Sequence, residues 1–107
     1  MRIISRRTLR EFVERLAGQK DQPAVKAALD AWFHEVSKAA WTNSADVKKF
    51  YATASIVSAE RVVFNIKSND YRRVVAVDYE KHIVWIKWIG THKAYDKIDL
   101  KEMHHGN

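Results

Sequence analysis

The sequence predicts an α+β domain in which an N-terminal helical hairpin packs on a small, twisted, mainly antiparallel β-sheet. Three observations support this fold class. The 107 residues, 47% of them apolar, are enough for one small core. Apolar residues recur at helical spacing within residues 1–40. After residue 60, runs rich in β-branched and aromatic residues alternate with short polar connections.

The N-terminal segment predicts a short strand followed by a helix. Residues 1–4, Met-Arg-Ile-Ile, are compatible with the strand. Thr8 and Glu11 have the spacing of a capping box, in which each side chain satisfies a free backbone amide at the helix start. Gly18 is positioned to end the helix in a left-handed conformation. The apolar positions recur at i, i+3, i+4 and i+7: Leu9, Phe12, Val13 and Leu16.

A second helix is predicted to begin near Pro23, the only proline, because proline is tolerated in the first turn of a helix. A short connection to the first helix predicts an antiparallel hairpin. After it, residues 43–46 are rich in capping residues and precede a basic and aromatic segment, residues 47–51, which predicts one or two further helical turns. The apolar stripe of the second helix comprises Val25, Leu29, Trp32, Val36 and Ala40.

Three strands are predicted in the second half of the chain. The short polar connections between them favour antiparallel hairpins over crossovers. The third strand is apolar on both faces except at Lys87, which predicts a strand covered on both sides and the most buried of the three. The strands span Arg61 to Lys67, Tyr71 to Tyr79 and Ile83 to Ile89.

The chain carries a formal charge of +6, with 19 Lys and Arg against 13 Asp and Glu. Residues 1–40 contain eight bases and five acids, and residues 41–107 contain eleven and eight, so each part contributes +3. Basicity spread over a compact domain favours a polyanionic partner, because neutralised phosphates release counterions. The alternative is a solvated basic surface with no such partner.

Composition also bears on the compartment. The chain has no cysteine, which excludes disulfides and thiol chemistry and is compatible with a reducing cytoplasm. The apolar run at residues 83–86 is broken by Lys87, and the Arg-rich N-terminus lacks the apolar region of a signal peptide. We therefore expect a cytoplasmic protein with no membrane partner.

The densest polar cluster, residues 90–97, directly follows the third strand. If this segment is helical, His92, Tyr95 and Asp96 share one face. If it is extended, His92 and Asp96 share a side and Tyr95 opposes them. A histidine and a carboxylate are neighbours in both cases, at a strand end that can hold functional groups rigidly. The alternative is a surface turn with solvated side chains.

A second candidate lies across the hairpin of the first two strands. If the turn is Ser68-Asn69, Asn65 lies opposite Arg72 on one face, and Arg73 lies on the other face with Phe64. A one-residue slip in the turn exchanges these partners, so the pattern leaves open which arginine faces a cleft. The alternative is an edge charge that discourages sheet-to-sheet pairing.

Together these residue types suit metal-independent cleavage of RNA, in which the ribose 2′-OH attacks the adjacent phosphate. Histidine suits the proton transfers, and arginine can donate two hydrogen bonds to phosphate oxygens. Tyrosine can stack on a base or orient an oxygen. Glu102, His104 and His105 are a weaker metal site, and no Gly-rich phosphate loop is present, so we expect neither a metal nor an organic cofactor.

Several segments resemble, in order and spacing, the HigB family of bacterial type II toxins, in the RelE-like superfamily of mRNA interferases. The most specific is the Thr-His-x-x-Tyr-Asp motif that begins at Thr91. The resemblance covers residues 1–100 as a single domain and leaves a C-terminal tail, residues 101–107, without a counterpart. The segments are Arg2-Ile3-Ile4-Ser5, Asp46-Val47-Lys48, Arg61 to Ile66, Asn69-Asp70-Tyr71-Arg72 and Gly90 to Asp99.

The resemblance implies a translation-inhibiting endoribonuclease that cleaves mRNA, commonly on the ribosome, without a cofactor. It also implies a HigA-like helix-turn-helix antitoxin, and contact with operator DNA only through the toxin–antitoxin complex. A non-catalytic basic module that blocks RNA or ribosome sites is the alternative function. The implied catalytic residues are Arg72 for phosphate binding, His92 for proton transfer, and Tyr95 and Asp96 for orientation. The implied RNA contacts are Lys48, Asn65 and Lys93. Arg73 is a further expected RNA contact, because the pattern leaves open which of the two arginines faces the cleft.

Overall fold

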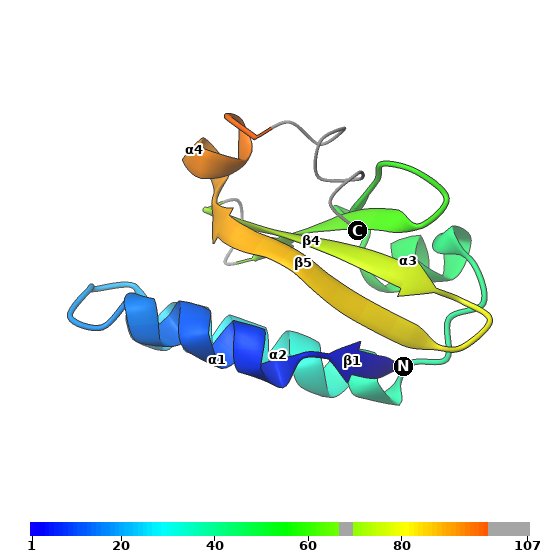
Figure 1. The fold of residues 1–107 in the computed structure, drawn as a ribbon, viewed down its shortest axis with the longest axis horizontal. Coiled ribbons are helices and arrows are strands. Elements are labelled where there is room, and N and C mark those ends of the chain that lie inside the picture. The colour runs from blue at the N-terminus through cyan, green and yellow to red at the C-terminus, as the bar shows by residue number, and fades with distance from the viewer. Residues whose placement is uncertain (67–69, 99–107) are drawn as a thin grey trace.

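The computed structural model describes residues 1–66 and 70–98. Within them a five-stranded sheet has the order β1-β5-β4-β3-β2, with β1 parallel to β5 and all other pairs antiparallel. The elements in chain order are β1 (Arg2–Ile4), α1 (Arg6–Arg15), α2 (Gln22–Lys38), α3 (Ser44–Phe50), β2 (Ser55–Ile56), β3 (Arg61–Ile66), β4 (Tyr71–Asp78), β5 (Ile83–Thr91) and α4 (His92–Tyr95) (Figure 1).

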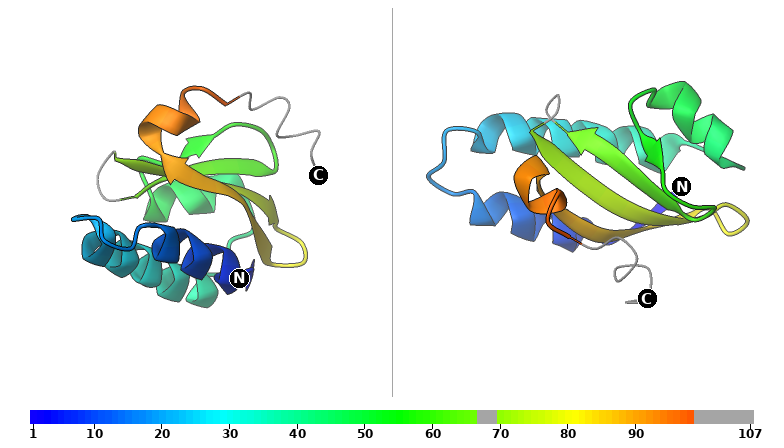
Figure 2. Two further views of the ribbon diagram at one scale, coloured as in Figure 1. Left: turned by 60° about the vertical axis from the view of Figure 1, so that its left-hand side comes forward. Right: turned by 90° about the horizontal axis from the view of Figure 1, so that it is seen from above.

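The helices α1 and α2 form an antiparallel hairpin on one face of the sheet, whereas α4 lies on the other side of it (Figures 1 and 2). We call the side of the sheet away from α1 and α2 the open face. The predicted fold class, a helical hairpin on a mainly antiparallel sheet, is confirmed. None of the helices within the described ranges combines the length and apolar composition needed to cross a bilayer.

The start of α1 differs from the prediction. The helix begins at Arg6, and its N-cap is Ser5, whose Oγ accepts a hydrogen bond from the Thr8 backbone N–H at 3.3 Å. The predicted capping box is therefore wrong. Because β1 pairs with β5 up to Ile4, the chain leaves the sheet at Ser5, and this hydroxyl is the first one able to cap the helix. Glu11 instead pairs with Arg7, Oε1 to Nε, at 2.8 Å.

The ends of the hairpin follow the sequence signals in part. Gly18 has φ +85°, the left-handed conformation predicted for it, but α1 already ends at Arg15 with Leu16 as its C-cap. Pro23 lies in the first turn of α2, as predicted. The stripe of α2 is buried as predicted from Val25 to Val36. Ala40 is exposed and does not belong to the stripe, because α2 ends at Lys38 and Ala39 is extended.

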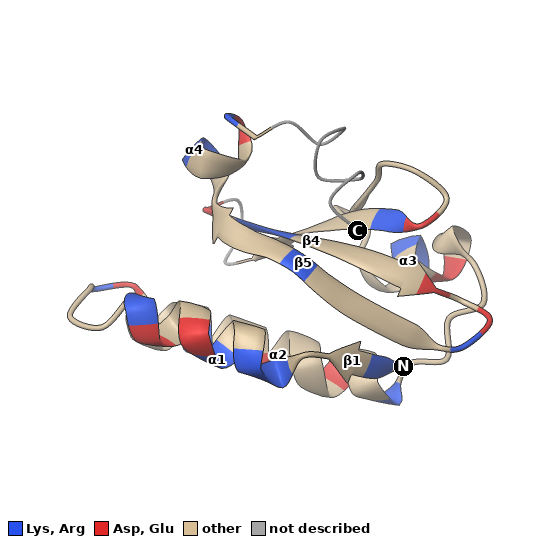
Figure 3. Ribbon diagram, viewed as in Figure 1, with Lys and Arg blue, Asp and Glu red and all other residues tan. Residues whose placement is uncertain are grey.

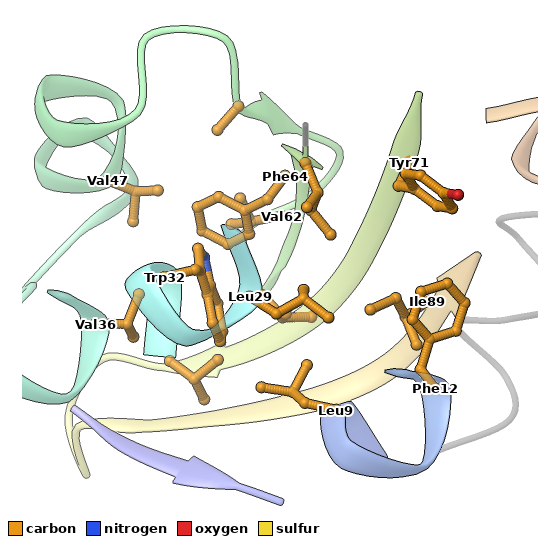
Figure 4. Close-up of a cluster of buried hydrophobic side chains, with 14 of the residues drawn as sticks. Leu9, Phe12, Leu29, Trp32, Val36, Val47, Val62, Phe64, Tyr71 and Ile89 are labelled. Atoms are coloured by element: carbon orange, nitrogen blue, oxygen red, sulfur yellow. The ribbon is translucent and has the colours of Figure 1, made fainter. Parts of the chain in front are cut away.

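The hydrophobic core lies between the hairpin and the sheet (Figure 4). Trp32 of α2 meets Phe64 of β3 edge-on, with ring centroids 5.5 Å apart, and Trp41 stacks against Phe64 at 6.3 Å. Phe12 of α1 meets Tyr71 of β4 edge-on at 6.0 Å. These contacts fix which residues of β3 and β4 face the helices, and their immediate neighbours must face the open side.

The predicted covering of β5 on both sides is wrong. The central and most buried strand is β4, while β5 lies between β4 and β1. On β5, Trp85 and Trp88 are half-buried and Lys87 is exposed. The pairing with β4 shifts between Val74 and Val75, opposite Lys87. The apolar run of β5 therefore reflects a bulge in the strand and not a strand covered on both faces.

Two short elements complete the fold. The predicted helical turns around residues 47–51 are confirmed as α3, capped by Asn43, whose Oδ1 accepts from the Asp46 N–H at 3.0 Å. The strand β2 was not predicted; it pairs with Val62 and Val63 of β3. The predicted Ser68-Asn69 turn and the tail from residue 101, with its weaker metal-site candidates, lie outside the described residues.

Arg73 lies in the core, with an exposure of 0%. Its guanidinium carbon is 3.7 Å from the centroid of the Trp32 ring, and among the described residues its nitrogens have no hydrogen-bond partner. Burial lowers the pKa of Arg73 to about 9, opposed in part by Tyr51, so the side chain stays charged at neutral pH. The expected RNA contact at Arg73 is therefore wrong in this conformation, since RNA cannot reach it.

The observed cap predicts the effect of substitutions at the start of α1. Ser5→Ala leaves the Thr8 N–H without its partner and should lower the free energy of unfolding by about 1 kcal/mol in urea titrations. Glu11→Ala removes only an exposed ion pair and should cost less than about 0.5 kcal/mol. A loss at Glu11 equal to that at Ser5 would contradict the assignment of the cap.

The buried charge predicts an increase in stability on its removal. Arg73→Met keeps a long side chain against Trp32 and removes a buried cation whose nitrogens have no hydrogen-bond partner among the described residues. We expect the free energy of unfolding to rise by about 1–4 kcal/mol, measured by urea and thermal unfolding. Arg10→Met makes the same charge change at an exposed position of α1 and should stay within about 0.5 kcal/mol of the parent. A less stable Arg73→Met protein would show that this cation has a stabilising partner.

Candidate functional site

One row of residues crosses the open face of the sheet. Asn65 of β3 pairs with Arg72 of β4, and Arg72 pairs with Gly90 of β5. Residues opposite one another in antiparallel strands point to the same side, so all three positions face away from α1 and α2. The structure therefore gives the register predicted for Asn65 and Arg72 and resolves the choice between the arginines, with Arg72 on the open face.

The polar segment after β5 is helical, one of the two alternatives left open by its sequence. Thr91 caps α4, its Oγ1 accepting from the Ala94 N–H at 3.1 Å. The His92 N–H donates to the Asp70 carbonyl at 2.9 Å, which ties the start of α4 to the beginning of β4. These two bonds turn the chain over the open face as soon as the strand ends.

Four side chains meet where α4 crosses the row: Arg72, His92, Tyr95 and Asp96, here called the Arg72–His92 cluster. Arg72 Nη2 lies 3.5 Å from His92 Nε2, and the same Nε2 lies 3.3 Å from Asp96 Oδ1. The Arg72 guanidinium carbon is 5.8 Å from the centroid of the Tyr95 ring. All four residues expected at the catalytic site are thus brought together.

The geometry gives His92 Nε2 a partner in either protonation state. Without a proton, this nitrogen can accept a hydrogen bond from Arg72; with one, it can donate to Asp96. The site is also open, because the side chain of His92 is 38% exposed and that of Asp96 63% exposed. A solvent-exposed imidazole beside a guanidinium is suited to proton transfer next to a phosphate.

The residues expected to contact RNA are arranged less tightly. Asn65 Nδ2 donates to the Thr53 carbonyl at 3.4 Å, and Lys48 Nζ donates to the carbonyls of Ala52 and Ala54, each at 2.8 Å. Asn65 and Lys48 are therefore linked through residues 52–54, and Asn65 is also next to Arg72 in the sheet. Lysine and arginine positions occur on α1, β5 and α4 alike and do not gather on one element (Figure 3).

Lys93 is exposed on α4, directly after His92. Arg73, by contrast, faces the helices and lies outside the cluster. Within residues 1–66 and 70–98, no three His, Cys, Asp or Glu side chains come close enough together to hold a metal ion.

Trp88, which was not predicted to belong to the site, also lies at the cluster. Its ring centroid lies 6.2 Å from that of Tyr95, with the two planes at 50°. A signal was available, since Trp88 and Gly90 are two residues apart on one strand and so face the same side. Because both faces of this strand were expected to be covered, Trp88 was not predicted to lie at an exposed site.

Comparison with known proteins identifies the family. A model of the HigB toxin family, described as the RelE-like toxic component of a toxin–antitoxin system, matches residues 25–98. The matched range runs from α2 through α4 and contains the whole Arg72–His92 cluster. No curated protein matches the chain. The predicted resemblance is confirmed: the chain belongs to the HigB toxin family and is a RelE-like toxin of a toxin–antitoxin system, which implies an antitoxin partner.

Proposed function

We propose that this toxin is an endoribonuclease that inhibits translation by cleaving mRNA through metal-independent attack of a ribose 2′-OH on the adjacent phosphate. The observation that carries the proposal is the 3.5 Å approach of Arg72 Nη2 to His92 Nε2 at a solvent-open site. A phosphate bound by the guanidinium is held beside the imidazole, where the proton of the attacking hydroxyl must be removed.

In the proposed reaction, His92 Nε2 takes the proton from the 2′-OH as the O2′–P bond forms. The P–O5′ bond breaks, and the imidazolium returns the proton to the departing 5′-oxygen. The products are a 2′,3′-cyclic phosphate and a 5′-hydroxyl, so no water and no redox partner is consumed. Arg72 stabilises the charge that builds up on the non-bridging oxygens between these steps.

The other two members of the cluster have positioning roles in this scheme. Asp96 Oδ1, 3.3 Å from His92 Nε2, accepts a hydrogen bond from the protonated imidazole and holds the ring over the site. Tyr95 packs beside the Arg72 guanidinium and limits its orientations, and its ring can contact the substrate. Lys48, Asn65 and Lys93 are the proposed contacts to the RNA on either side.

The substrate and partners follow from the family and the proposed chemistry. We propose that the mRNA is cleaved while it is being translated, which places the reaction on the ribosome and in the cytoplasm. The antitoxin is proposed to be a HigA-like helix-turn-helix protein, and operator DNA to be contacted only by the toxin–antitoxin complex.

Substitutions in the cluster should abolish toxicity. His92→Ala should lower the cleavage rate about 10²–10⁴-fold and Arg72→Ala about 10²–10³-fold, and both should relieve growth arrest in cells without antitoxin. The matched controls are His34→Ala on α2 and Arg10→Ala on α1, both exposed and outside the cluster. The controls should stay toxic, and all four variants should keep the thermal unfolding transition of the parent. Full toxicity of both cluster variants would show that the catalytic site lies elsewhere.

Mapping of RNA ends separates cleavage from blockage of translation. Primer extension on mRNA from cells expressing the toxin should show discrete new 5′ ends, and these should be absent with His92→Ala. The same ends should form in a reconstituted translation reaction and be much weaker on free mRNA without ribosomes. Uniform loss of translation with intact mRNA would instead support the non-catalytic alternative.

A further inference from the structure

A gap in the row on the open face is filled by an aromatic ring. Asn65 and Arg72 each contribute a polar side chain to this row, whereas Gly90 contributes none. A Cβ atom at Gly90 would lie only 2.7 Å from Cζ2 and 2.8 Å from Cη2 of Trp88, so the benzene ring of the indole occupies that space. The row therefore presents an amide, a guanidinium and an indole in succession.

The position of this indole is fixed from several sides. Trp88 pairs with the buried Val74 on β4, and its ring lies against the Gly90 backbone. On another side it meets Tyr95 of α4, whose ring is also within 5.8 Å of the Arg72 guanidinium carbon. Trp88 is half-buried, so part of the residue stays accessible. A large aromatic surface held rigid beside a guanidinium is the arrangement by which proteins bind single-stranded nucleic acid, with bases stacked on the ring and phosphates on the cation.

We propose that Trp88 forms a nucleobase-binding site, on which a base of single-stranded RNA stacks when a neighbouring phosphate is bound at Arg72. The inference deepens the proposed function and rests on it, because it concerns the same RNA at the same site. Stacking tolerates any base, since every base has a π-face. Asn65, at the other end of the row, can add hydrogen bonds to a base edge.

A purely structural Trp88 would cover Val74 and Gly90 without contacting RNA. Both roles predict that loss of the indole affects stability, so stability alone cannot separate them. Only the stacking role makes the effect of a Trp88 substitution depend on whether one particular nucleotide carries a base. The test therefore varies the base and the side chain together.

The measurement is the affinity of the purified toxin for uncleavable RNA, followed by fluorescence anisotropy. The RNAs are single strands of about ten nucleotides with every 2′-oxygen methylated, within the usual site size of single-strand binders. The four homopolymers are compared first, and a series with one abasic position is then made from the tightest binder. The protein variants are Trp88→Phe, which keeps a ring, and Trp88→Leu, which keeps an apolar side chain without one. Trp85→Leu is the control. Trp85 lies on the same strand as Trp88 and also faces the open side, but it lies beyond the bulge, where it pairs with Ala76 of β4.

With the parent protein, one abasic position should weaken binding about five- to 150-fold, the range measured for loss of a base–aromatic stack. Trp88→Leu should weaken binding to the intact RNA by a similar factor and should be insensitive to the abasic position. Trp88→Phe should keep most of the affinity and the sensitivity, and Trp85→Leu should behave like the parent.

An abasic penalty that persists in Trp88→Leu, or an equal loss in Trp85→Leu, would overturn the assignment of Trp88. This failure can be told from failure of the proposed function, because binding is measured without cleavage. Cleavage that depends on His92 with no effect of Trp88 would reject only the stacking site. Trp88-dependent binding with no cleavage of ordinary mRNA would reject only the nuclease. A toxin that binds no RNA at low salt would count against the stacking site. Whether the protein is a nuclease would then be decided by the mapping of cleaved mRNA ends.

Discussion

The strict alternation of side chains along β4 is the constraint on which the whole site depends. Two consecutive arginines occupy this strand, and the register sends Arg73 against Trp32 in the core and Arg72 to the open face beside His92. A slip of one residue would exchange them and remove the guanidinium from the cluster. The packing that sets the register, Phe64 against Trp32 above all, is therefore also what makes the site possible.

The second requirement is that β5 turns into a helix as soon as it ends. The Thr91 cap and the bond from the His92 N–H to the Asp70 carbonyl direct α4 back over the sheet. His92 and Asp96 then lie one helical turn apart, on the side that faces Arg72. Because neighbouring elements supply the cluster, it needs no long loop to order it, and the side chains of His92 and Asp96 stay exposed to solvent.

Sequence periodicity predicted the elements that are long enough to repeat a pattern. The helical hairpin, the strands β3 to β5 and the pairing of Asn65 with Arg72 were all predicted, the last only on condition of a particular turn. The two-residue strand β2 was missed because it is too short to show a period. The covering of β5 was misjudged because an apolar run does not reveal a bulge, and for the same reason Trp88 was overlooked at the site. Which arginine is buried stayed open, since it depends on the turn between β3 and β4 and pattern alone does not distinguish two adjacent arginines.

The charge of the two arginines does not determine which of the two registers β4 adopts. Either register buries one arginine of the pair, so the cost of placing a guanidinium in the core nearly cancels in the comparison. The discrimination must come from the rest of the strand. In the observed register Tyr71, Val75 and Val77 face the helices and are buried, and Asp78 lies on the other side, half-exposed. A one-residue slip would turn Asp78 toward the helices and move the Tyr71 ring away from Phe12. Val74 and Ala76 would replace Val75 and Val77 after such a slip, so Tyr71 and Asp78 decide which arginine lies beside His92, even though neither belongs to the cluster.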